Sequence, residues 1–200
     1  MEQITTSENI KPFNKEEQIR LSILLDSILN GLERDESMNK TINNLLRHFL
    51  WNATAYTNDS NNSPYELQPF WTEKAIRQYI STKYDNYSKR VYNLRHEHSV
   101  PIALIKEKIW YLKSQIEIEQ LLSNLSIAVV LTKEEDALLN KIYSKYLPDS
   151  FNWEKPNIFS RYIECKIGPI YDIRENQMLF DIIACNKKKE FEKFEYKIVC

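Results

Sequence analysis

One cluster near the middle of the chain combines side chains that serve acid–base chemistry and metal binding: Arg95, His96, Glu97 and His98. Two of the three histidines in the chain belong to this cluster. Imidazole titrates near neutral pH and is a common metal ligand, and a helix that starts beside it can stabilise a phosphate. We therefore take the cluster as the first candidate catalytic site, with His96 and His98 as its candidate metal ligands.

The sequence around this cluster resembles known patterns. Residues Leu94–Pro101 and Val129–Glu135 together resemble an R-H-E-H-x-x-P and V-V-L-T-K-E-E pattern in uncharacterised bacterial proteins, which implies no known activity. Residues Glu97–Pro101 also resemble the E/D-H-x-x-P opening of HNH nucleases, in which a histidine activates water beside a metal ion. The later histidine of that motif has no counterpart, since no His follows His98. The alternative is structural, with either histidine capping the helix expected after Pro101 or binding a backbone carbonyl.

A second candidate site lies nearer the C-terminus. Pro148-Asp149, followed after fourteen residues by Glu164-Cys165-Lys166, resembles the PD-(D/E)xK pattern of restriction-type nucleases. In that family the two acids hold Mg²⁺ or a similar ion, and the lysine stabilises the developing charge. Asp149, Glu164 and Lys166 are therefore the alternative catalytic set. The pattern has low specificity, because Glu195-Tyr196-Lys197 is a second Glu-x-Lys triplet.

Two looser patterns precede the histidines. Arg90 and His96 have a spacing similar to that of helical HEPN ribonucleases, where such a pair cleaves RNA without a metal. Tyrosines and cations also interleave from Lys83 to Arg95, as they do in proteins that stack single-stranded bases and pair with phosphates. The simpler interpretation, which we favour, is that the tyrosine rings are buried and the cations lie at the surface.

Apolar periodicity predicts the elements that must position these residues. Three- and four-residue spacings and N-capping residues indicate six helices, over residues 15–32, 37–53, 72–83, 102–113, 116–125 and 132–146. Thr132 and Glu135 form a capping box at the start of the last of them. The apolar, β-branched run at residues 127–131 is the best strand. Further strands are expected at 162–167 and 196–199, with a helix near 175–185.

Glycine is scarce, and this restricts the fold class. Only Gly31 and Gly168 occur, so phosphate-binding loops that need several glycines are excluded and tight two-residue hairpins are disfavoured. The sequence therefore predicts a mainly α fold: a single compact helical domain over residues 1–200, with a minor β element in the C-terminal half. Within this domain we expect a polar N-terminal tail over about residues 1–14 and a flexible loop over about residues 57–69.

Charge and cysteine content suggest a cytoplasmic protein. The formal net charge is −1, the three cysteines show no C-x-x-C spacing, and no apolar run is long enough to cross a membrane. We expect either a nucleic-acid-acting protein or a non-enzymatic module. The first would be a metal-assisted nuclease of a bacterial or phage defence system using Mg or Mn. The second would be a helical interaction module with a protein partner, such as an immunity, inhibitor or regulatory protein.

Overall fold

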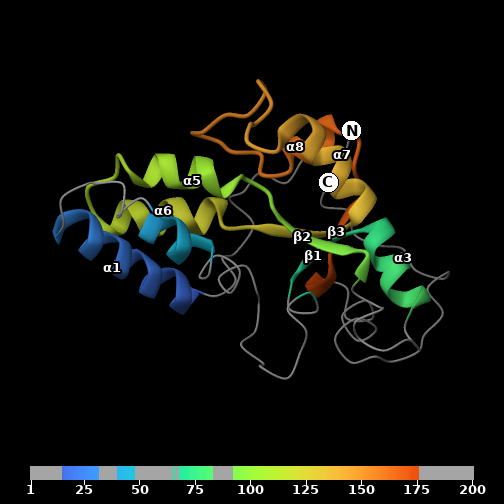
Figure 1. Ribbon diagram of the computed structural model, residues 1–200, viewed down its shortest axis with the longest axis horizontal. Helices are drawn as coiled ribbons and strands as arrows, with labels where there is room; N and C mark the ends of the chain where they lie inside the picture. Colours follow the sequence, from blue (N-terminus) through green and yellow to red (C-terminus); the bar gives the residue numbers. More distant parts are fainter. Residues whose placement is uncertain (1–14, 32–39, 48–64, 66–67, 83–91, 176–200) are drawn as a thin grey trace.

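The computed structural model describes residues 15–31, 40–47, 65, 68–82 and 92–175 of the 200-residue chain. Figure 1 shows these elements as two groups joined by two strands. Helices gather at one end, and a four-stranded sheet flanked by further helices forms the other end. β2 (Leu94–His98) leads from the sheet toward the helical end, and β3 (Ala128–Thr132) leads back into the sheet.

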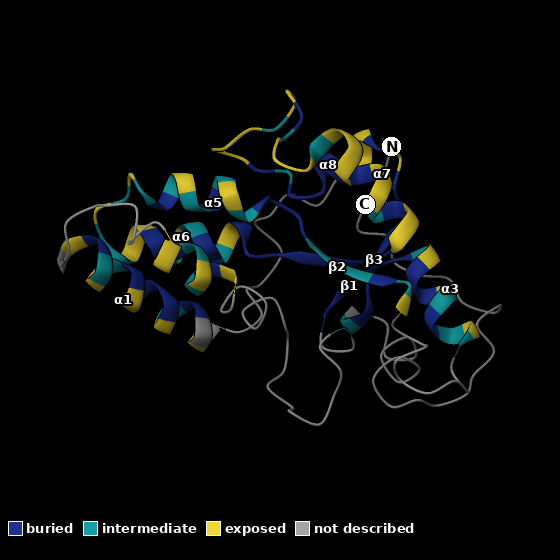
Figure 2. Ribbon diagram, viewed as in Figure 1, coloured by how far each residue is buried: buried dark blue, intermediate teal, exposed yellow. Residues whose placement is uncertain are grey.

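The helical end consists of α1 (Lys15–Gly31), a helix over residues 40–47, α5 (Ile102–Ile109) and α6 (Gln115–Leu125). Their apolar faces meet in one core that contains Leu21, Leu25, Ile105, Ile118 and Leu122, and Figure 2 shows these faces turned inward. Burying each such side chain contributes about 1.5–3 kcal/mol. In the described part of the chain, no helix combines the length and apolar character needed to cross a membrane.

The sheet has the order β2-β3-β1-β4, with β1 at Phe70–Thr72 and β4 at Ile170–Asp172. β1 and β3 are parallel neighbours, while β2 pairs with β3 and β4 pairs with β1 in antiparallel register. All five residues of β3 are buried, as expected for a central strand covered on both faces. The short η2 turn (Ile173–Glu175) follows β4.

Helices cover the two faces of the sheet. α3 (Glu73–Ser81) packs Ala75, Ile76 and Tyr79 against a cluster that includes Trp71 and Val130. The opposite face carries Phe70, Val129 and Leu131, which pack with Leu139 of α7 and Tyr162 of α8. α7 spans Lys133–Tyr143 and α8 spans Ser160–Glu164. The sheet is therefore enclosed by α3 on one side and by α7 and α8 on the other.

Each of the two parallel strands runs directly into a helix. Thr72 caps α3 and Thr132 caps α7, each hydroxyl accepting a hydrogen bond from a backbone N–H three residues later. Glu135 joins the two caps, because its Oε2 accepts hydrogen bonds from the Thr72 hydroxyl at 2.7 Å and from the Thr132 backbone N–H at 2.9 Å. The predicted capping box at Thr132 is therefore confirmed.

The predicted mainly α fold is wrong, because the chain forms a mixed α/β structure around the four-stranded sheet. β1 and β4 are only three residues long, which is too short to show an alternating pattern. Glycine scarcity did not exclude a sheet, because each connection between consecutive strands contains at least one helix and none is a tight hairpin. The β structure is also central, not confined to the C-terminal half.

Of the two predicted strands that fall within the described residues, one forms and the other does not. The strand expected at 127–131 is confirmed as β3. The strand expected at 162–167 is wrong, because α8 and a left-handed residue, Lys166 with φ 55°, occupy that stretch. The tail over 1–14, the strand at 196–199 and nearly all of the helix at 175–185 lie outside the described residues. So does most of the loop at 57–69, whose last residues, Gln68 and Pro69, are buried.

Candidate functional site

The predicted catalytic cluster is β2 itself, and the alternation of the strand divides it between two faces. His96 and His98 project to the same face, where their rings meet edge to face with centroids 5.0 Å apart and planes at 89°. Glu97 projects to the other face, toward α7 and α8. Residues that are adjacent in sequence therefore do not form one site: the two imidazoles are together and the carboxylate is apart from them.

The histidine face is an environment for neutral rings. His98 is 8% exposed, and burial, assisted by the positive charge of Arg161, lowers the pKa of His98 to about 4. Burial, followed by the proximity of His98, also holds the pKa of His96 well below its ordinary value. The Nδ1 atom of His98 has no hydrogen-bond partner among the described residues. Both imidazoles are therefore uncharged at neutral pH.

The opposite face of β2 carries a buried ion pair. Arg161 of α8 is 0% exposed, and one of its terminal nitrogens lies 3.0 Å from Oε1 of Glu97. The same guanidinium donates hydrogen bonds to the carbonyl of His98 at 2.8 Å and to that of Tyr143 at 2.6 Å. Burial raises the pKa of Glu97, and the charge of Arg161 acts in the opposite direction. Arg161 thus ties β2, α7 and α8 together, and Glu97 serves that junction.

The donor set on β2 does not fit the expected Mg or Mn ion. Among the residues that the structure describes, no group of three or more His, Cys, Asp or Glu side chains is placed to hold a metal. Mg²⁺ and Mn²⁺ favour oxygen ligands, whereas the histidine face offers two imidazoles and the nearest carboxylate, Glu97, is bound to Arg161.

The alternative set lies on the surface around the end of α8. Asp149 is exposed in the segment after α7, and Glu164 is the last residue of α8. Oε1 of Glu164 accepts a hydrogen bond from Ser150 at 3.4 Å, so the acid lies beside the Asp149 segment. Lys166 is exposed after the helix. The pattern therefore lacks the strand that presents Glu and Lys side by side in PD-(D/E)xK nucleases.

The remaining sequence candidates are only partly described. Arg90, the partner of His96 in the HEPN-like spacing, lies outside the described residues, as do Lys83 to Val91 as a whole. The guanidinium of Arg95 donates hydrogen bonds to the carbonyl oxygens of Leu94 at 2.7 Å and Tyr92 at 3.1 Å. Arg95 therefore braces the backbone at the start of β2.

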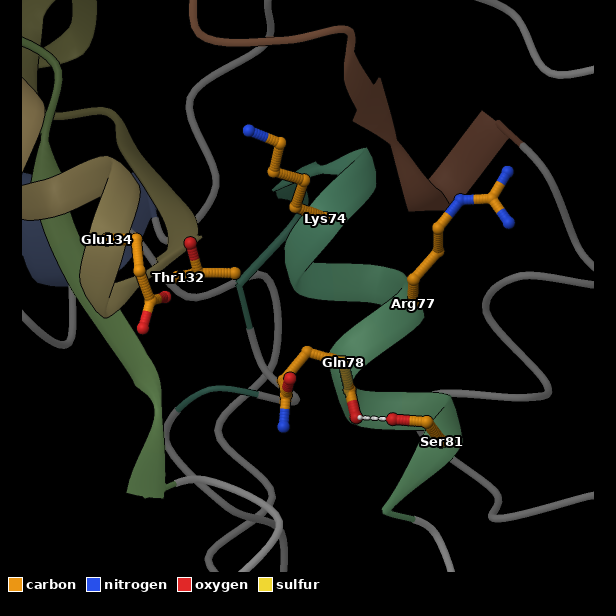
Figure 3. Close-up of a pocket in the computed structure, with 6 residues that line it drawn as sticks. All are labelled: Lys74, Arg77, Gln78, Ser81, Thr132 and Glu134. Atoms are coloured by element: carbon orange, nitrogen blue, oxygen red, sulfur yellow. Dashed lines mark hydrogen bonds between the residues drawn. The ribbon is translucent and has the colours of Figure 1, made fainter.

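A groove that sequence analysis missed lies between α3 and the start of α7. Its volume is about 500 Å³, and it is lined by Lys74, Arg77, Gln78, Ser81, Thr132 and Glu134. Figure 3 shows Thr132 and Glu134 on one side of the groove and α3 on the other, with Arg77 directed away. No local signal identifies it, since its two sides are separated by about fifty residues and meet only when β1 and β3 pair.

A second surface missed in the sequence is an apolar stripe on α7. We define the α7 stripe as Leu138 and Ile142 of α7 together with Tyr146, three residues beyond the end of the helix; they follow one another at four-residue spacing and are 44%, 52% and 68% exposed. The buried face of α7 is formed by Glu135 and Leu139. Helical periodicity could have revealed this stripe, but the sequence does not show which apolar face of a helix is the buried one.

Comparisons of the chain with protein-family models, with curated proteins and with solved structures give no match.

Proposed function

We propose that this protein is a non-enzymatic interaction module that binds a partner protein through the α7 stripe. The observation that carries the proposal is the exposure of three large apolar side chains at four-residue spacing: Leu138 and Ile142 on α7, and Tyr146 just after the helix ends. Single exposed apolar residues are ordinary, but a row at helical spacing matches the way a helix docks against a partner.

The β2 cluster also supports this proposal, because its side chains contribute to the fold. Its groups are engaged in the fold: Arg161 neutralises Glu97, and the histidines are neutral and enclosed. A general base or a metal ligand must be free to reach its substrate or ion, whereas Glu97 is held by Arg161 and His98 is buried. The helix that carries Leu138 and Ile142, by contrast, is anchored at both ends, because the capping box fixes the start of α7 and Arg161 binds the Tyr143 carbonyl at its end.

The proposal is tested by placing a photo-crosslinking amino acid at Ile142 in the native cell. We expect an adduct with one defined protein, also obtained from Leu138 but not from Tyr111, a control residue that is 74% exposed at the end of α5. The double variant Leu138→Glu/Ile142→Glu should melt like the wild type and fail to bind the identified protein when both are purified. Equal adducts from Tyr111, or undiminished binding by the double variant, would contradict the proposal.

A further inference from the structure

The groove between α3 and α7 lies where open α/β sheets bind ligands. β1 and β3 are parallel neighbours, and the chain leaves their carboxyl ends in opposite directions. From β1 it passes through α3 on one face to β2, and from β3 through α7 on the other face to β4. Because α3 and α7 start directly after these strands, the groove between them lies at the carboxyl ends of the parallel pair, the end of the sheet at which α/β proteins usually bind ligands.

We infer that this groove binds a nucleotide, with its phosphate at Lys74 and the N–H edge of its base, preferably guanine, at Glu134. This site is separate from the α7 stripe and goes beyond the proposed partner binding. A volume of about 500 Å³ suits a ligand of this size.

Three side chains in the groove are uncommitted. The side-chain ammonium of Lys74, amide of Gln78 and carboxylate of Glu134 form no hydrogen bond or ion pair with any described residue, and the bond drawn in Figure 3 joins the Ser81 hydroxyl to the backbone carbonyl of Gln78. Lys74 and Gln78 lie one turn apart on α3. Arg77 differs, because its guanidinium is bound to Glu73 and points away from the groove. The groove thus presents one free ammonium, one free amide and one free carboxylate.

This combination of charges selects the class of ligand. A bare polyanion would be repelled by Glu134, and a cationic peptide would be repelled by Lys74. A nucleotide carries an anionic phosphate for the lysine and N–H donors for the acid on a single small molecule. Guanine suits a carboxylate best, because its adjacent N1–H and N2–H groups can donate to both oxygens at once. The amide of Gln78 can donate to or accept from either part of the ligand.

Titration calorimetry with GMP, AMP and guanosine tests the inference. The wild type should bind GMP about tenfold more tightly than AMP, which is the discrimination expected of one good bidentate contact. Lys74→Gln should weaken GMP by about tenfold and leave guanosine unchanged, because only the phosphate contact is lost. Glu134→Gln should bring GMP and AMP to within about twofold of each other. The control Lys141→Gln, on the exposed side of α7, should change nothing.

A 5′-phosphorylated trinucleotide beginning with guanine distinguishes the source of the ligand. Tighter binding than GMP identifies a single strand, and equal or weaker binding identifies the free nucleotide; both agree with the inference. Equal affinity of the wild type for GMP and AMP, absence of GMP binding at millimolar concentration, or an effect of Lys141→Gln equal to that of Lys74→Gln would overturn it. These outcomes are independent of the α7 stripe, whose partner binding is measured with other residues.

Discussion

The two faces of β2 both bury ionisable side chains, but they accommodate them in different ways. One face carries His96 and His98, and the other carries Glu97, although all three lie within one five-residue strand. Burial penalises the charged form of each group. Burial lowers the pKa of both histidines, so they are neutral in the folded protein. Glu97 instead faces the buried guanidinium of Arg161.

This difference determines what each face can tolerate. The neutral imidazole of His98, whose Nδ1 has no hydrogen-bond partner among the described residues, can be replaced by an apolar side chain of similar size at little cost. A buried ion pair cannot lose one member, because the other is left as an uncompensated charge. The polar residues on the two faces therefore contribute unequally to stability. We expect the largest contribution from Arg161, which lies outside the cluster and pairs with Glu97.

Removing Arg161 tests the ion-pair face and should give the largest effect. Arg161→Met leaves Glu97 and the carbonyls of His98 and Tyr143 without their donor. We expect a loss of about 3–5 kcal/mol in the free energy of unfolding, measured by urea denaturation. The control is Arg77→Met, which removes the exposed pair with Glu73 and should cost less than about 1 kcal/mol. Similar losses in the two variants would mean that the buried pair has no special role.

Lowering the pH tests the histidine face. The folded chain protonates His98 only with a pKa of about 4, whereas the unfolded chain does so near 6.5, so the unfolded state binds more protons between these values. The contribution of His98 is thus complete above about pH 6.5 and is lost as the pH falls. Between pH 7 and pH 5, His98 should cost the wild type about 2 kcal/mol in the free energy of unfolding.

A leucine variant isolates this titration from that of the other groups. His98→Leu should keep its stability at pH 7 and lose less than the wild type on going to pH 5, by about the 2 kcal/mol assigned to His98. Glu97 titrates in the opposite sense, since its raised pKa favours protonation in the folded state as the pH falls. Parallel pH profiles for the wild type and His98→Leu would show that the imidazole is not enclosed as described.

The sequence predicted best where the structure depends on neighbours along the chain. Helix starts at Thr72 and Thr132, the capping box with Glu135, and the apolar strand at 127–131 all depend on contacts within a few residues. Local chemistry determines such features. The helices at 102–113 and 116–125 were likewise predicted from periodicity and are α5 and α6.

The sequence predicted least where structure depends on distant partners. The polar run Leu94–His98 has the composition of a site, and it becomes an edge strand only because β3 pairs with it. Arg161 contacts Glu97 across 64 residues, and nothing near either residue indicates the pair. The groove between Lys74 and Glu134 depends on the parallel pairing of β1 with β3. Tertiary contacts of this kind override local pattern and spacing.

Adding metal ions should have the smallest effect of all, and it separates a structural histidine face from a metal site. An ion that binds only the folded state at a hundred times its Kd would stabilise the protein by about 2.7 kcal/mol, which corresponds to several degrees in Tm. Because no Cys, Asp or Glu of the described part of the chain joins the two imidazoles in a group that could hold a metal, we expect the Tm of the wild type to change by less than about 1 °C with Mg²⁺, Mn²⁺ or Zn²⁺. His98→Ala supplies the control in the same thermal melts. It should melt below the wild type because a cavity replaces the ring, and it should be equally indifferent to all three ions. A stabilisation by Zn²⁺ in the wild type that disappears in His98→Ala would reverse the assignment, because only ligation by the imidazole produces that difference.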